Sequence, residues 1–113
     1  MTYDELRDEV RNQGGVLTVD MGTLRDAHGA GKLGVNVRLN ITKELRGQGL
    51  NHIGEYLPTY QDELVRLYLM GSPAGDLIES VLNISKSADQ AIRDAVQSDA
   101  ADVLEKVREL VCE

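Results

Sequence analysis

The chain has 113 residues, of which 42% are hydrophobic and 27% charged, and its 19 acidic and 12 basic side chains give a net charge of −7. These values are typical of one globular domain and exclude wholesale disorder. No segment approaches the roughly 18 apolar residues of a membrane-spanning helix, and the acidic N-terminus lacks the apolar stretch of a signal peptide. We therefore expect a soluble, cytoplasmic protein that does not associate with membranes.

Helix and strand signals alternate along the first part of the chain. A capping-box pattern at Thr2 begins a helix, which a Gly-Gly pair ends. The β-rich run 16–19 predicts a short strand. A second helix is expected over 22–28, with Asp20 as its N-cap. A third is expected over 35–46, where the apolar residues Val37, Ile41 and Leu45 recur every fourth position. A glycine-rich turn separates these two helices.

Two further strand signals follow. The run 50–53 predicts a second short strand, and 63–69 alternates between an apolar face and an outer face that carries Arg66 and Tyr68. A helix beginning at Thr59 also fits this stretch. In that case the whole chain would be a helix bundle.

Helices are predicted for the last third of the chain. Ser72 and Pro73 are typical of a helix start, Ser87 begins a second capping box, and Ser98 is the expected N-cap of a final helix. The first of these helices is expected to bury an apolar stripe formed by Leu77, Ile78, Val81 and Leu82. The final helix either folds back on the core or pairs with a second subunit through Val103, Val107 and Leu110.

The order helix, strand, helix, helix, strand, strand resembles that of winged helix-turn-helix domains. The resemblance implies an α+β, mostly helical fold, with a winged-helix-like core over 1–70 and additional C-terminal helices in 71–113. It also implies that 21–50 forms the helix-turn-helix, that 35–46 is the recognition helix, and that 52–69 forms a two-stranded wing.

The charge distribution fits nucleic-acid binding by the core. Five basic and two acidic residues lie between residues 21 and 54, whereas 71–113 carries four basic and nine acidic residues. Winged-helix domains usually bind duplex DNA, so the resemblance implies that helix 35–46 enters the major groove. We expect a dimeric transcriptional regulator, because small DNA-binding regulators without a ligand domain usually gain affinity by dimerisation. The residues expected at phosphates are Arg25, Lys32, Lys43 and Arg46, and those expected at base edges are Asn36, Arg38 and Asn40.

An alternative function on the same fold is an acidic protein–protein interaction module, either an adaptor or an inhibitor of a DNA-binding enzyme. The expected wing is acidic, whereas a wing that contacts DNA normally carries Arg or Lys. Its loop is also apolar and aromatic. This loop either packs back on the body or contacts a protein partner through Tyr56, Leu57 and Tyr60.

No pattern predicts an enzyme, a cofactor or a metal site. The glycines of 29–34 match G-x-G-x-x-G, but the preceding strand and βαβ unit of a dinucleotide site are missing, so a turn with positive φ is the better interpretation. The two histidines, His28 and His52, are expected at the surface or in turns. Cys112 is the single cysteine, which excludes an internal disulfide.

Overall fold

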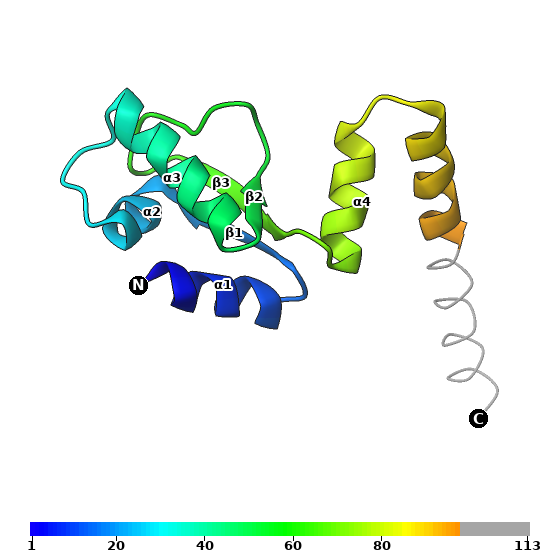
Figure 1. Cartoon of the computed structure of the whole chain (residues 1–113), viewed down its shortest axis with the longest axis horizontal. Coiled ribbons are helices and arrows are strands. Elements are labelled where there is room, and N and C mark those ends of the chain that lie inside the picture. The colour runs from blue at the N-terminus through cyan, green and yellow to red at the C-terminus, as the bar shows by residue number, and fades with distance from the viewer. Residues whose placement is uncertain (98–113) are drawn as a thin grey trace. The chain divides into compact units, whose positions relative to one another are not determined.

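The computed structural model describes residues 1–97 and has the predicted α+β class and order of elements (Figure 1). The chain divides into two compact units, Met1–Gly75 and Asp76–Glu113. In chain order, the first unit contains α1 (Tyr3–Asn12), β1 (Val16–Asp20), α2 (Met21–His28), α3 (Val35–Gly47), β2 (Leu50–His52) and β3 (Leu64–Leu69). Helix α4 (Pro73–Leu82) crosses the boundary between the units, and a further helix covers 86–97.

The three strands form one antiparallel sheet in the order β1-β3-β2. β1 pairs with β3 along its whole length, from Val16 opposite Tyr68 to Asp20 opposite Leu64, and β2 pairs with the other edge of β3. The strand predicted at 63–69 is thus confirmed. The alternative in which this stretch is helical, and the all-helical bundle that followed from it, are wrong.

The predicted helix starts depend on local side-chain caps. The Thr2 Oγ1 atom accepts a hydrogen bond from the Glu5 amide at 3.2 Å at the start of α1. Asp20 Oδ1 accepts from the Thr23 amide and from the Thr23 hydroxyl, both at 2.8 Å, at the start of α2. These bonds favour the ionised carboxylate and lower the pKa of Asp20. Both caps confirm the sequence prediction.

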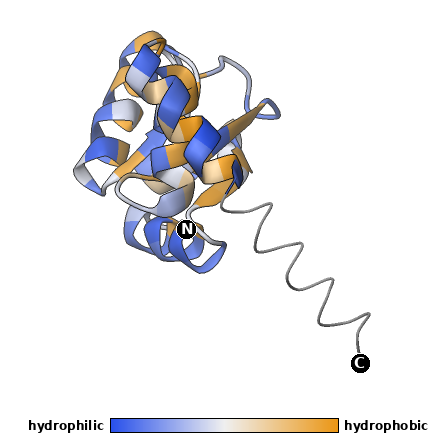
Figure 2. Cartoon of the chain, turned by 90° about the vertical axis from the view of Figure 1, so that its right-hand side faces the viewer, coloured by the Kyte–Doolittle hydropathy of each residue, from blue (hydrophilic) through white to orange (hydrophobic). Residues whose placement is uncertain are grey.

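The core of the first unit lies between its three helices and one face of the sheet. Each helix places an apolar stripe there, and the stripe predicted for α3 is confirmed, since Ile41 and Leu45 are buried and Val37 packs against them. Figure 2 shows hydrophobic and hydrophilic residues alternating along the helices, as amphipathic helices require. The buried core consists of Leu6, Val10, Met21, Leu24, Ile41, Leu45, Leu50, Leu57, Val65 and Leu67.

The burial of side chains on the face of β3 that carries Arg66 and Tyr68 differs from the prediction. Arg66 is exposed, as expected, but Tyr68 on the same face is almost completely buried. Strand alternation fixes which face a side chain points to, but not whether that face is covered at each position. Tyr68 therefore belongs to the interior rather than to an outer face.

A tight corner joins β3 to α4. The Ser72 hydroxyl donates to the Leu69 carbonyl at 2.7 Å and accepts from the Gly75 amide at 2.9 Å, which confirms Ser72 as the N-cap. Gly75 lies so close to the Leu69 carbonyl that a Cβ atom at this position would overlap it. Only glycine allows this approach of the first turn of α4 to the end of β3.

The second unit is less well packed than the sequence predicts, as far as residue 97. Leu77 and Ile78 are half-buried, but Val81 and Leu82 are exposed, so the predicted buried stripe of α4 is wrong at these two positions. The helix over 86–97 is capped by Ser85 rather than by the predicted Ser87, because the Ser85 hydroxyl accepts from the Ala88 amide at 3.1 Å. The capping pattern begins two residues earlier than expected.

Some predictions fall on residues 98–113. The predicted N-cap Ser98 and the predicted partner contacts Val103, Val107 and Leu110 lie outside the residues that the structure describes. Within residues 1–97, no helix combines the length and apolar character needed to cross a membrane.

Candidate nucleic-acid interface

The outer face of α3 is formed by the residues that its core stripe leaves exposed. Gly29, at φ +74°, is the C-cap of α2, and Gly34, in extended conformation, is the N-cap of α3. These glycines confirm the turn between the two helices. With Ile41 and Leu45 turned inward, a helix with 3.6 residues per turn must present the opposite side to solvent. The polar residues exposed there are Asn36, Asn40, Lys43 and Arg46.

The basic residues around α3 differ in how far other side chains engage them. Lys32, Lys43 and Arg46 are exposed and form no salt bridge within residues 1–97. Arg25 is engaged, because it donates to Gln61 Oε1 at 2.6 Å and lies 3.4 Å from an Asp26 carboxylate oxygen. Unpaired cations can neutralise a bound anion without first breaking an intramolecular contact. Three of the predicted phosphate contacts are therefore available for binding.

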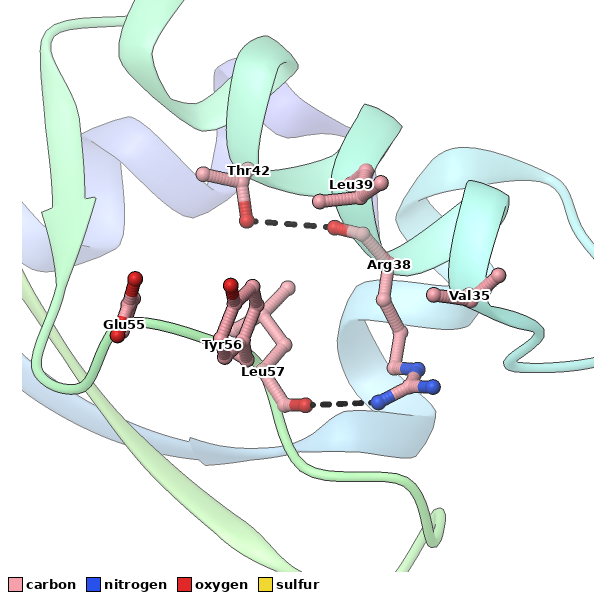
Figure 3. A pocket seen from close by; sticks show the side chains of 7 residues that line it. All are labelled: Val35, Arg38, Leu39, Thr42, Glu55, Tyr56 and Leu57. Atoms are coloured by element: carbon pink, nitrogen blue, oxygen red, sulfur yellow. Dashed lines mark hydrogen bonds between the residues drawn. The ribbon is translucent and has the colours of Figure 1, made fainter.

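Arg38 does not lie free on the outer face. Its Nη1 atom donates to the Leu57 carbonyl at 3.2 Å and to Thr59 Oγ1 at 3.3 Å, which ties α3 to the loop between β2 and β3 (Figure 3). Its Nε atom is buried without a hydrogen-bond partner in the described part of the chain. The predicted base contact of Arg38 does not agree with this geometry, because its Nη1 atom binds the loop and its Nε atom is buried.

An apolar groove lies between α3 and the loop that follows β2. Val35 and Leu39 border it from α3, and Tyr56 and Leu57 border it from the loop (Figure 3). The cavity measures about 260 Å³, and Arg38, Thr42 and Glu55 complete its lining. Val35, Leu39 and Tyr56 remain 61%, 46% and 70% exposed, respectively, although they are apolar or aromatic.

The sequence left two alternatives for the loop between β2 and β3: packing on the body of the unit, or contact with a protein partner. Different residues of the loop fit each alternative. Leu57 is buried in the core, so its predicted role as a partner contact is wrong, because the side chain packs against the body of the unit. Tyr56 and Tyr60 are both exposed, as a contact residue must be. The acidic residues Glu55 and Glu63 are also exposed, which keeps this loop negatively charged.

A hydrogen-bonded chain supports the groove from the side of the sheet. The Thr42 hydroxyl lies 3.2 Å from the Arg38 carbonyl, to which it donates, and 2.9 Å from His52 Nε2. Since a hydroxyl has one proton, this arrangement assigns the proton between Thr42 and His52 to the imidazole. His52 Nδ1 is buried and has no hydrogen-bond partner within residues 1–97.

Burial, and secondarily the positive charge of Arg46, lower the pKa of His52. Folding therefore favours the neutral form of the imidazole. The expectation that His52 lies at the surface or in a turn is wrong, because β2 places its side chain in the interior.

The second histidine also has a structural contact. The Tyr3 hydroxyl and His28 Nδ1 are 2.9 Å apart, which joins α1 to the end of α2. Burial of the Tyr3 phenol, reinforced by the negative charge of Glu44, raises the pKa of Tyr3 to about 12. No group of three or more potential metal ligands occurs within residues 1–97.

An acidic hollow limits where a polyanion can lie on the first unit. It is found at the start of α2, has a volume of about 350 Å³, and is lined by Asp20, Asp26 and Asp62 together with Gly22, Thr23 and Gln61. Three carboxylates repel phosphate groups at this position. The exposed cations without a salt bridge in residues 1–97 therefore lie away from this hollow, on the outer face of α3 and in the turn before it.

Sequence reasoning missed the apolar groove and the tie formed by Arg38. The sequence does hold a signal for the groove, because Val35 and Leu39 are four residues apart on α3 but lie outside its core stripe. Comparison of the chain with models of protein families, with curated proteins and with solved structures found no match. The functional argument therefore rests on the geometry of this surface.

Proposed function

We propose that this chain is a small winged-helix DNA-binding protein that inserts α3 into the major groove of duplex DNA. The observation that carries the proposal is the outer face of α3, where exposed amide side chains lie beside exposed cations. These cations form no salt bridge with an acidic residue of the described range 1–97. The order α1–β1–α2–α3–β2–β3 supports it, as does the pairing of β2 with β3, the two strands expected for a wing.

The proposal divides the exposed residues between two kinds of contact. Lys32, Lys43 and Arg46 contact phosphates, which supplies affinity that depends on salt but not on sequence. Asn36 and Asn40 lie one turn apart on α3 and contact base edges, where an asparagine amide matches the donor and acceptor of adenine. Arg25 is a weaker candidate for phosphate, because Gln61 and Asp26 already engage it.

Arg38 receives a positioning role in place of base recognition. By binding the Leu57 carbonyl and the Thr59 hydroxyl, it holds the loop after β2 against α3. A loop fixed in this way leaves the outer face of α3 uncovered. We therefore assign the direct DNA contacts to its neighbours on the helix.

The wing makes few contacts to DNA phosphates in this proposal. Its loop carries the exposed acidic residues Glu55, Asp62 and Glu63. Between positions 50 and 70, the only arginine or lysine is Arg66, which is exposed on β3. A negatively charged loop cannot enter the minor groove closely, because the phosphates on both sides repel it. The phosphate contacts are therefore concentrated on α3 and the turn before it.

A second copy of the chain completes the proposed regulator. Apolar residues of the second unit that remain exposed, Val81, Leu82, Ile84 and Val96, offer a surface for self-association. A symmetric dimer would place its two α3 helices about 34 Å apart, one turn of B-form DNA. Two linked sites would also raise the affinity of each single α3 contact.

Retention of duplex DNA from a random pool tests this function. The purified full chain is incubated with the pool at low salt, and the retained fragments are sequenced. We expect enrichment of sites in which a short sequence is repeated as a palindrome, since a symmetric dimer recognises two half-sites. Failure to retain any duplex at low salt would contradict the proposal.

A second candidate function is a protein-interaction module on the same fold. It is favoured by the net charge of −7 and by the apolar groove beside α3, where a hydrophobic side chain of a partner would fit. The same retention experiment separates the two functions. A module of this kind retains no DNA, and its binding to a partner is insensitive to loss of Lys43.

A further inference from the structure

We infer that the groove between α3 and the loop after β2 recognises the 5-methyl group of thymine. This inference rests on the proposed DNA-binding function and names the base feature that the site selects. It is carried by the placement of the exposed side chains Val35, Leu39 and Tyr56 around one apolar groove between α3 and this loop. The proposed occupant belongs to duplex DNA, because the thymine methyl is exposed in the DNA major groove.

The first step of the argument is the chemistry of the exposed helix face. Val35 and Leu39 lie one turn apart on α3, and Leu39 lies between Arg46 and Lys43 around the helix axis, at 100° per residue. Cations that bind phosphates would therefore bring Leu39 to the base edges, with Val35 beside it one turn earlier. In the major groove, the apolar group that a base pair presents is the thymine methyl.

The second step is the selectivity of the groove itself. Its walls are mainly apolar side chains, and the Glu55 carboxylate on its lining would repel a phosphate. Tyr56 lines the groove from the loop and Leu39 lines it from α3 (Figure 3), so a methyl group in the groove would be offered apolar surface from both elements. Water leaves this surface when the methyl enters, which is the source of the affinity.

The third step is that the groove is held open before DNA binds. Arg38 ties the loop to α3 through the Leu57 carbonyl, and Leu57 is anchored in the core. The Thr42 hydroxyl, in contact with both the Arg38 carbonyl and His52, braces the other side. A preformed site loses little conformational freedom on binding, so a small group such as a methyl can contribute measurably.

Replacement of thymine by deoxyuridine tests the inference, because the two bases differ only in the methyl group. The full chain first selects a duplex from a random pool, and each thymine of the selected site is then replaced singly. We expect at least one replacement to weaken binding about fourfold, the effect of one buried methyl group. That loss should shrink to less than twofold in the variant Leu39→Ala, which no longer contacts the methyl.

A matched control comes from β3. Leu64 is 68% exposed, against 46% for Leu39 and 61% for Val35, and it does not line the groove. The variant Leu64→Ala should keep the full sensitivity to deoxyuridine, whereas Leu39→Ala and Val35→Ala should lose it. Since all three side chains are substantially exposed, each variant is expected to fold, which circular dichroism verifies.

The outcomes separate this inference from the function on which it rests. Retention of DNA with every deoxyuridine replacement within twofold of the parent would overturn methyl recognition and leave DNA binding intact. A loss that persists undiminished in Leu39→Ala would also overturn it, because the methyl would then contact another part of the protein. Absence of any DNA retention would overturn both proposals.

Discussion

At the scale of single residues, His52 links the stability of the first unit to pH. Its imidazole is buried, its Nε2 atom contacts Thr42, and burial lowers its pKa. A histidine whose pKa is lower in the folded state binds its proton more readily when the chain is unfolded. The stability that depends on the neutral form is therefore present above the ordinary histidine pKa of about 6.5 and is lost as the pH falls below it.

We expect the free energy of unfolding to decrease between pH 7 and pH 5, and urea denaturation at several pH values measures it. The variant His52→Gln is the control, because an amide donates to Thr42 as the imidazole does but does not titrate in this range. Its stability should depend less on pH over the same interval. An identical pH dependence in both proteins would contradict the role of His52.

The hydrogen bond between Tyr3 and His28 allows a second test on single residues. Tyr3→Phe removes the hydroxyl that lies 2.9 Å from His28 Nδ1 and leaves the ring in place. The expected loss is about 1 kcal/mol of unfolding free energy, the usual contribution of one such bond. Tyr60→Phe is the matched control, since Tyr60 is exposed and its loss of a hydroxyl should change stability little. Equal effects of the two substitutions would contradict this account.

At the scale of elements, local signals and long-range contacts differ in how well the sequence predicts them. The N-caps Thr2, Asp20 and Ser72 were predictable, because each cap binds an amide only three residues away. The burial of His52 and Tyr68 was not, since it depends on what covers a strand after the chain has folded.

In the candidate interface, too, local features could be predicted from the sequence and long-range contacts could not. The exposed amides and cations of α3 were predictable from helical periodicity, given its buried stripe. The hydrogen bonds from Arg38 to Leu57 and Thr59 join residues about twenty positions apart, so no local sequence pattern predicts them.

The tie between α3 and the following loop can be tested through Arg38→Ala. The substitution removes the bonds to Leu57 and Thr59 and should loosen the loop, which faster hydrogen exchange of the loop amides would reveal. Binding to a selected site and to random duplex should weaken by similar factors, because Arg38 positions the surface and contacts no base. A loss confined to the selected site would instead show that Arg38 recognises bases.

The corner between β3 and α4 gives a prediction on element packing. Gly75→Ala places a methyl group against the Leu69 carbonyl and should cost about 1–3 kcal/mol of stability, as overpacking typically does. Gly31→Ala is the control, because no atom lies within 4 Å of the Cβ it would add. Thermal denaturation of the two variants measures the difference. Equal melting temperatures for Gly75→Ala and the parent protein would contradict the close approach.

At the scale of the whole molecule, the charge is distributed unevenly. The net charge of −7 opposes binding to a polyanion in general, but five of the basic residues lie between positions 21 and 54 with only two acids. Coulomb interactions beyond about 10 Å are screened at 0.1 M salt, so the local surface of α3 dominates at contact. The net charge of −7 is therefore compatible with the proposed function, in which the exposed cations of α3 contact DNA.

The most direct test of DNA binding by α3 is the salt dependence of affinity for a random duplex, compared between two double variants. Lys43→Gln with Arg46→Gln removes two unpaired cations of α3, and Lys86→Gln with Arg93→Gln removes two exposed cations of the second unit, so the change in net charge is the same. We predict that the first pair weakens binding and makes the slope of log affinity against log salt shallower by about 2, since each phosphate contact contributes about 0.9. The second pair should leave the slope unchanged. Equal slopes for both pairs, or no measurable binding by the parent protein at low salt, would contradict the assignment of DNA binding to α3.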